Sequence, residues 1–174
     1  ALHTKTGCVG VLATKGTFDG RLYKATSRKY AKNTNIEVQI GDGLVELVES
    51  NKIETGEATE LLKKYVLPMI EHNADQIVLG CTHYPFFKSQ IEKIAGSAVN
   101  VIDPAPAVAK HIGEVLKEND LQTDNQIGND LFLSSSSTNA MKLLLENVLK
   151  IKVDDVEITK NGEKTNAIRR KTTE

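Results

Sequence analysis

The alternation of short apolar runs with amphipathic segments is the feature that most constrains how this chain can fold. Apolar residues recur at helical spacing within residues 61–70 and 108–116, which places each set on one face of a helix. Pro68 is expected to kink or interrupt the first of these helices. The other apolar runs have strand length and end at turn signals: Val9 to Ala13, Ile36 to Ile40, Gln76 to Gly80, Val99 to Ile102 and Leu131 to Leu133. This order predicts an α/β fold, with a mostly parallel sheet flanked by helices on both faces.

Composition excludes several classes of protein. A chain of 174 residues with 40% hydrophobic residues can bury one sizeable core or two small lobes. Its formal net charge of -1 argues against a nucleic-acid partner, and no apolar run approaches the ~20 residues needed to cross a membrane. Cys8 and Cys81 lack paired or metal-type spacing, which favours a reducing cytoplasm and no metal site. We therefore expect a cytoplasmic protein with a small-molecule partner.

The segment Gly80-Cys81-Thr82-His83-Tyr84-Pro85 is the strongest candidate for chemistry. It follows an apolar strand, and Pro85 suits the first turn of a helix, so Cys81 should lie in a strand-to-helix turn at the carboxyl edge of the sheet. A helix N-terminus and a nearby imidazole, here His83, both favour a reactive thiolate. The alternative is that Cys81 is a buried small hydrophobe and His83 a solvated loop residue.

A second strand end carries hydroxyl groups. Residues 9–13 are followed by Thr14-Lys15-Gly16-Thr17, in which Thr17 can cap a helix and Gly16 lets a carboxylate approach the backbone closely. A helix cap with a glycine turn explains the same residues without any ligand. The turn Gly41-Asp42-Gly43 marks a third strand end and is weak evidence alone.

Three segments of this chain together resemble the cofactor-independent glutamate racemases: VGVLATKGT at 9–17, GCTHYPFF at 80–87 and VIDPAPAVAK at 101–110. The resemblance covers about residues 7–150 and implies the carboxyl-terminal part of such an enzyme. It implies that Cys81 is one of two catalytic cysteines, that His83 assists it, and that no cofactor is needed. It also implies that Thr82 and His83 contact glutamate, with Thr14 and Thr17 near the same cleft. Two thiols on opposite faces of the substrate would interconvert L- and D-glutamate and supply D-glutamate for peptidoglycan.

The sequence departs from this family at two places. Gly41-Asp42-Gly43-Leu44 stands where the family usually has a Cys-Pro pair, and the amino-terminal region with the second Cys-Asn-Thr motif has no counterpart here. We therefore expect an Asp/Glu racemase-type lobe at 1–97, elements at 98–150 that would complete the absent lobe, and a polar tail at 151–174. Within this tail, residues 154–174 offer one possible short strand and are otherwise expected to be frayed. The elements at 98–150 should expose apolar faces around Val108, Ile112, Val115 and Leu144, so a homo-oligomer is expected.

Two other functions are compatible with the residues. The first is an aspartate racemase or another member of the superfamily, although aspartate racemases typically have Glu at the position of His83. The second is a non-catalytic module that binds a carboxylate at the strand ends.

Overall fold

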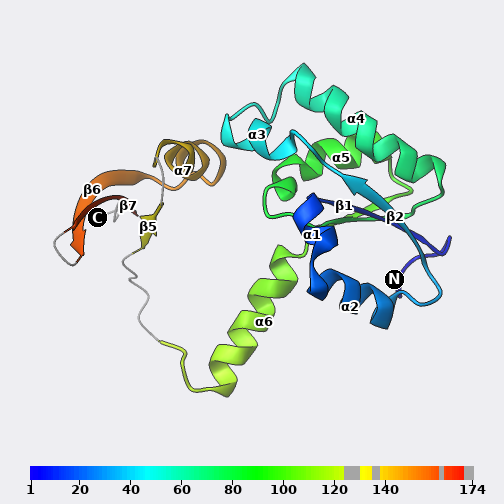
Figure 1. Cartoon of the computed structure of the whole chain (residues 1–174), viewed down its shortest axis with the longest axis horizontal. Helices are drawn as coiled ribbons and strands as arrows, with labels where there is room; N and C mark the ends of the chain where they lie inside the picture. The colour runs from blue at the N-terminus through cyan, green and yellow to red at the C-terminus, as the bar shows by residue number, and fades with distance from the viewer. Residues whose placement is uncertain (124–129, 135–137, 161–162, 171–174) are drawn as a thin grey trace.

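The protein forms a four-stranded parallel sheet, followed along the chain by a three-stranded antiparallel sheet (Figure 1). The computed structural model describes residues 1–123, 130–134, 138–160 and 163–170. The strands are β1 (Cys8–Ala13), β2 (Asn35–Ile40), β3 (Gln76–Leu79), β4 (Asn100–Ile102), β5 (Leu131–Leu133), β6 (Val153–Lys160) and β7 (Glu163–Arg170). The helices are α1 (Lys15–Asp19), α2 (Arg21–Tyr30), α3 (Leu44–Glu49), α4 (Gly56–Glu71), the 3-10 helix η1 (Tyr84–Phe87), α5 (Lys88–Ala95), α6 (Ala105–Glu118), α7 (Asn139–Leu143) and the π-helix η2 (Leu144–Val148).

Helices cover both faces of the parallel sheet, whose strand order is β2-β1-β3-β4. In Figure 1, α3, α4 and α5 lie on one side of the strands, and α1 and α2 lie on the other. Within β1, Cys8 and Leu12 point to the larger core under α3–α5, whereas Val9, Val11 and Ala13 pack toward Phe18 of α1 and Tyr23 of α2. Every residue of β1 is buried. The predicted α/β architecture is confirmed.

The core helix α4 runs through Pro68 to Glu71. The predicted interruption at this proline is therefore wrong. Pro68 lies in the last turn of the helix, where only one backbone hydrogen bond is lost, and its carbonyl still accepts from the backbone of His72 at 3.1 Å. Leu62, Val66 and Met69 on the buried face stabilise the helix against the sheet.

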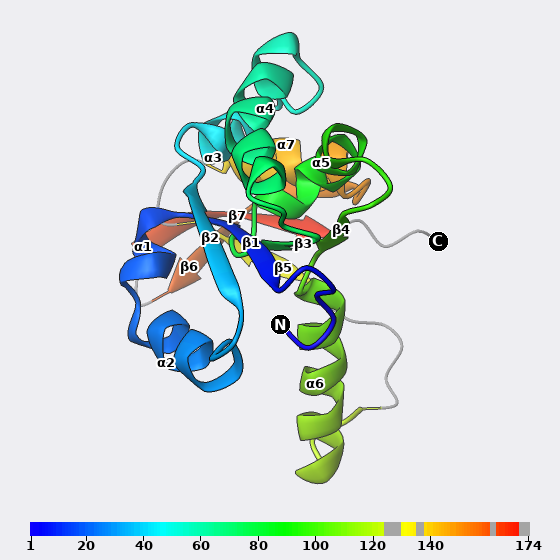
Figure 2. The same ribbon diagram turned by 90° about the vertical axis from the view of Figure 1, so that its right-hand side faces the viewer.

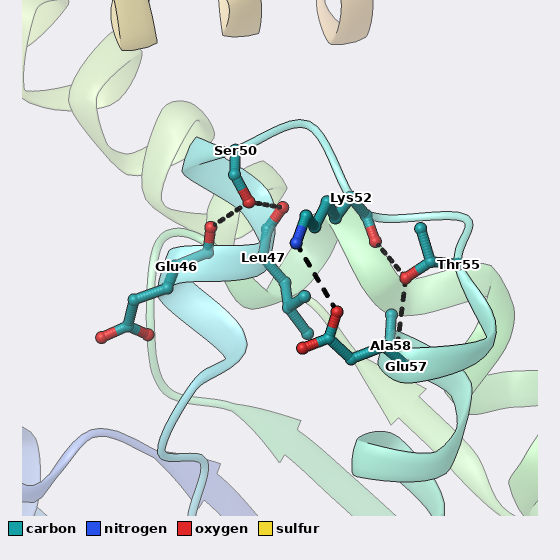
Figure 3. Close-up of polar contacts among 7 residues, drawn as sticks. All are labelled: Glu46, Leu47, Ser50, Lys52, Thr55, Glu57 and Ala58. Atoms are coloured by element: carbon teal, nitrogen blue, oxygen red, sulfur yellow. Dashed lines mark hydrogen bonds and ion pairs between the residues drawn. The ribbon is translucent and has the colours of Figure 1, made fainter.

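The hairpin between α3 and α4 is fixed by local polar contacts (Figure 3). Thr55 caps α4 by accepting from the backbone N–H of Ala58 at 3.2 Å, and its hydroxyl donates to the carbonyl of Lys52 at 2.9 Å. Ser50 ends α3 by donating to the carbonyl of Glu46 at 2.6 Å. An exposed ion pair between Lys52 and Glu57 spans the turn at 3.7 Å. These contacts fix the turn that connects the end of α3 to the start of α4.

The carboxyl-terminal part corrects two expectations. β4 pairs with β3, so the parallel sheet continues beyond residue 97, where we expected the lobe to end. Residues 153–160 and 163–170 form antiparallel strands that pair with each other and with β5, in place of the polar tail with one possible short strand expected over 151–174. Val153 and Ile168 are buried in a small core with Leu145, and this core stabilises the second sheet. Residues 161–162 and 171–174 of the expected tail lie outside the described residues.

Helix α6 extends away from both sheets (Figures 1 and 2). Its apolar side chains lie at helical spacing and are exposed, as predicted: Val108 by 55%, Ile112 by 54% and Val115 by 40%. Leu144 differs from the prediction, because the α7–η2 segment contacts α3 and Leu144 is partly buried against the larger core.

Asp75 ties the amino-terminal segment to the start of β3. Its carboxylate accepts from the Thr4 hydroxyl at 2.6 Å and from the backbone N–H groups of Lys5 at 2.6 Å and Thr6 at 3.2 Å. Desolvation raises the pKa of Asp75, but these donors outweigh it and hold the pKa below the ordinary value of 3.8. A carboxyl group whose pKa is lower in the folded than in the unfolded protein stabilises the fold at pH values above its unfolded-state pKa. This stabilisation is lost as the pH falls through the folded-state pKa.

Replacing Asp75 by Asn should destabilise the protein by about 1 kcal/mol at pH 7, since an amide cannot accept from all three donors and partial exposure screens the charge. The difference from the unmodified chain should narrow as the pH falls below 3.8, where Asp75 of the unfolded chain becomes protonated, and should vanish below the lower pKa of the folded state. Urea unfolding at pH 7 and pH 3 measures this. The matched control is Asp19→Asn, at an exposed carboxylate of α1. If Asp75→Asn lowers the free energy of unfolding equally at pH 7 and pH 3, the ionised carboxylate of Asp75 does not stabilise the fold in this way.

Candidate active site

Cys81 and His83 lie together in the turn that follows β3. The Cys81 sulfur is 4.0 Å from Nδ1 of His83, and the thiol is partly exposed. The turn is closed by the backbone N–H of Tyr84, which donates to the carbonyl of Cys81 at 3.2 Å. The structure thus brings together the two residues that the sequence singled out, at a distance at which a thiol and an imidazole can share a proton.

Glu49 contacts the other side of the same imidazole. Its carboxylate Oε1 lies 3.4 Å from Nε2 of His83. A carboxylate can only accept a hydrogen bond, so the contact favours the tautomer with a hydrogen on Nε2, in which Nδ1 of a neutral ring can accept a proton from Cys81. Sequence analysis missed Glu49, because it lies at the end of α3 and nothing in its local sequence marks it.

Thr14 and Thr17 lie at the adjacent strand end. Their hydroxyls are 3.1 Å apart, and the Thr17 hydroxyl donates to the carbonyl of Gly80 at 3.2 Å. The contact joins the end of β1 to the residue before Cys81. Gly80 permits this close approach, since a Cβ there would lie 2.9 Å from that of Ala13. Thr17 does not cap a helix as predicted: α1 begins at Lys15 with Thr14 as the capping residue, so Thr17 lies inside the helix.

The helix expected directly after Cys81 begins later than predicted. Residues Tyr84–Phe87 form a 3-10 turn with Pro85 in its first positions, and the α-helix α5 starts at Lys88. A short 3-10 turn contributes only a small dipole, so the effect of a helix N-terminus on the thiol is weaker than the sequence suggested. Thr82, the third predicted residue of this turn, is exposed.

The loop Gly41-Asp42-Gly43 lies beside the turn that carries the thiol. The hydroxyl of Tyr84, which is fully buried, donates to the carbonyl of Gly41 at 2.9 Å, and that of Tyr65 donates to the carbonyl of Asp42 at 2.9 Å. Burial, and then the nearby charge of a Cys81 thiolate, raises the pKa of Tyr84 far above its usual value of 10. The Tyr84 phenol therefore stays protonated and donates at any physiological pH.

Cys8 is a contrasting thiol. It is 4% exposed in β1, and its sulfur accepts from the Asn35 side chain at 3.6 Å. Burial raises the pKa of Cys8, which the Asn35 bond only partly offsets. Cys8 is thus a core residue at the amino end of β1, whereas the candidate site lies at the carboxyl end of the strands.

In the ranges 1–123, 130–134, 138–160 and 163–170, the side chains of His, Cys, Asp and Glu do not group in a way that could hold a metal ion. Within those ranges, no helix has the length and apolar character of a membrane span.

A parallel sheet with a partly exposed thiol, an imidazole and two threonine hydroxyls near its carboxyl edge defines an α/β protein with a candidate small-molecule site at that edge. The Asp/Glu/Hydantoin racemase family matches residues 1–112, and the chain belongs to this family.

Individual relatives agree with this assignment. The chain is 35% identical over 157 residues to a glutamate racemase of Pseudomonas putida. The matched region covers 90% of this chain and 59% of that relative. Among solved structures, glutamate racemase isoform RacE1 from Bacillus anthracis matches with a TM-score of 0.78 at 25% identity, over 92% of this chain and 60% of that one. A glutamate racemase of Francisella tularensis, crystallised with D-glutamate, matches with a TM-score of 0.61 at 28% identity, over 69% of this chain and 45% of that one. The chain thus spans roughly half to three-fifths of the length of these proteins.

Iodoacetamide should modify Cys81 faster than Cys8 at neutral pH, because Cys81 is partly exposed beside His83 whereas burial shields Cys8 and raises its pKa. We expect a ratio of at least about tenfold, because the buried Cys8 is both shielded from the reagent and less readily ionised. Mass spectrometry of the two cysteine peptides measures both rates in one sample. Replacing His83 by Ala should slow the labelling of Cys81 and leave that of Cys8 unchanged. Equal labelling of the two cysteines would contradict this assignment.

Proposed function

We propose that this chain is the carboxyl-terminal part of a cytoplasmic glutamate racemase, which interconverts L- and D-glutamate without a cofactor and supplies D-glutamate for peptidoglycan. The observation that carries the proposal is the contact between Cys81 and His83 at the carboxyl edge of the sheet, within the segment GCTHYP. The names of the relatives, all glutamate racemases, support the choice of substrate.

The proposed reaction moves one proton at each face of the substrate. His83 accepts the proton of Cys81 at Nδ1, and the resulting thiolate removes the α-hydrogen of L-glutamate as a proton. The bonding electrons stay on the α-carbon as a carbanion delocalised into the neighbouring carboxylate. A second thiol, on the opposite face of the substrate, then donates a proton to give D-glutamate. The reverse reaction uses the same groups in the opposite order.

The remaining residues bind and orient the substrate. Thr82 is exposed next to the thiol and is available to a ligand, and His83 contacts the substrate from the same turn. Thr14 and Thr17 hold the end of β1 against Gly80, so their hydroxyls border the thiol turn. The Thr17 hydrogen is used by the carbonyl of Gly80, so it is the Thr14 hydroxyl that can turn to donate to a carboxylate there. Donors aimed at a carboxylate stabilise the carbanion next to it. In this proposal, Glu49 keeps the His83 ring in the tautomer that accepts from sulfur.

The second thiol is expected from a segment outside these 174 residues. Cys8 is buried in the core and cannot reach a substrate at the carboxyl edge. The exposed apolar face of α6, comprising Val108, Ile112 and Val115, is the surface against which such a segment would pack. Without it, the same face should drive association of the chain into a homo-oligomer.

The 174-residue chain alone should not exchange the α-hydrogen of glutamate with D₂O, because inversion needs acids and bases on both faces. A protein extended to the full length of the relatives, with its second Cys-Asn-Thr motif, should exchange and invert glutamate. In that longer protein, Cys81→Ala should reduce turnover by at least ~10²-fold, the contribution of a positioned acid or base. Proton NMR in D₂O measures exchange, and circular dichroism measures inversion. Inversion by the 174-residue chain as a monomer, verified by light scattering, would show that the second base lies within it.

In the full-length protein, His83→Ala should lower kcat from L-glutamate by on the order of 10²-fold and kcat from D-glutamate by less, since His83 serves the thiol that takes the L-proton. The difference between the two directions should appear in kcat, because the equilibrium constant fixes the ratio of the two kcat/KM values. Initial rates at saturating substrate in each direction measure it. An equal loss of kcat in both directions would argue that His83 does not serve this thiol.

A further inference from the structure

The turn that carries Cys81 and His83 is joined to α3 by a closed ring of contacts. His83 is followed in the chain by Tyr84, whose hydroxyl bonds to the carbonyl of Gly41. Gly41 begins the loop that leads into α3, and the last residue of α3 is Glu49. The Glu49 carboxylate then returns to His83. The distance between Glu49 and the imidazole therefore depends on how firmly the loop is tied to the turn.

The Tyr84–Gly41 contact has the properties of a fixed connection. Tyr84 is fully buried, and its burial-raised pKa keeps the phenol a donor. Gly41 is buried as well, and a Cβ at this position would lie 2.6 Å from the Tyr84 oxygen and 2.8 Å from Cδ1 of Leu44. Glycine is thus the residue that lets the phenol reach the backbone carbonyl. The loop is also held to the sheet, since the N–H of Gly41 donates to the carbonyl of Ala13 at 3.1 Å.

Other contacts of the loop do not involve the thiol turn. Tyr65 ties the carbonyl of Asp42 to α4, and buried Leu44 and Leu47 pack α3 onto the core. These contacts fix α3 within the core. Glu49 itself is exposed by 51%, so little packing holds its side chain, and its reach to His83 depends on the relative position of helix and turn.

We infer that Tyr84 is a positioning residue, whose buried hydroxyl holds the loop at Gly41 against the thiol turn and so keeps Glu49 within reach of His83. The inference rests on the proposed function, because it assigns Tyr84 to the Cys81–His83 site. Tyr84 acts through Glu49 and His83 and does not touch the substrate. Its role is carried by one oxygen atom, because the ring alone fills the core equally well in phenylalanine.

A double-mutant cycle on this chain tests the inference, with the iodoacetamide labelling rate of Cys81 as the readout. Glu49→Gln removes a group that can only accept and should slow labelling by about two- to tenfold, the range that one net hydrogen bond represents. In the Tyr84→Phe background, Glu49→Gln should change the rate by less than about 1.5-fold, because the contact with His83 is already lost. Tyr65→Phe is the matched control, since it removes a buried phenol bond to the next carbonyl of the same loop. In that background the full effect of Glu49→Gln should remain.

The outcomes separate the inference from a merely structural role. Tyr84→Phe and Tyr65→Phe should lose similar stability in urea, since each loses one hydrogen bond, while only Tyr84→Phe removes the effect of Glu49. An undiminished Glu49→Gln effect in the Tyr84→Phe background would overturn the inference, as would its loss in both phenylalanine backgrounds. Absence of any Glu49→Gln effect in the unmodified chain would overturn it too. None of these results affects the α-hydrogen exchange by the full-length protein, which tests the proposed function separately.

Discussion

Parallel pairing of β1 with both β2 and β3 is the constraint on which the candidate site depends. The register aligns Ala13 with Ile40 and Leu12 with Leu79, so the carboxyl ends of three strands lie at one edge of the sheet. The backbone N–H groups that follow continue the pattern: Gly41 donates to the carbonyl of Ala13 and Gly80 to that of Leu12. Hydroxyl, thiol and loop carbonyl groups far apart in the sequence are thereby fixed within one small region. A shift of one residue in either register would turn the side chains of the strand to the opposite face of the sheet. The hydroxyl, thiol and carbonyl groups would then no longer lie together.

The polar contacts at this edge are individually weak but mutually dependent. An exposed carboxylate such as Glu49 contributes little to stability by pairing with His83, because water and salt screen the pair. In the proposed site its role is geometric, since an acceptor at Nε2 favours the tautomer whose Nδ1 can accept from the sulfur. The hydrogen bonds that hold the surrounding backbone are better shielded, namely the buried phenol of Tyr84 on Gly41 and the Thr55 cap of α4.

The sequence predicted the parallel sheet and the pairing of Cys81 with His83, because both depend on local pattern. Apolar β-branched runs mark buried strands, and two residues of one turn are close in any fold. What it failed to predict depends on tertiary contact or on turn geometry. Glu49 reaches His83 through the packing of α3, and the 3-10 turn at Tyr84–Phe87 forms where residues 84 and 87 must both be buried.

The error over β6 and β7 has a different cause. The sequence of these strands is mostly polar, so apolar periodicity was too weak to reveal them. Among the side chains of these strands that the structure describes, Val153 and Ile168 are buried. The dipeptide Asn161-Gly162 between them in the sequence is typical of two-residue hairpin connections, and it was the signal available. Antiparallel hairpins need little core of their own when a neighbouring strand, here β5, completes the sheet.

The position of the thiol also limits what this part of the chain can do alone. A substrate at the carboxyl edge of one parallel sheet meets groups that approach its α-carbon from the side of that sheet. Inversion requires a proton donor from the opposite side, and a single sheet edge cannot bend round to provide it. In the proposed reaction, the opposite wall therefore comes from another segment, held by an apolar surface that fixes it within a fraction of an ångström. Helix α6 leaves the sheet with Val108, Ile112 and Val115 exposed along one face, which gives such a wall a place to pack.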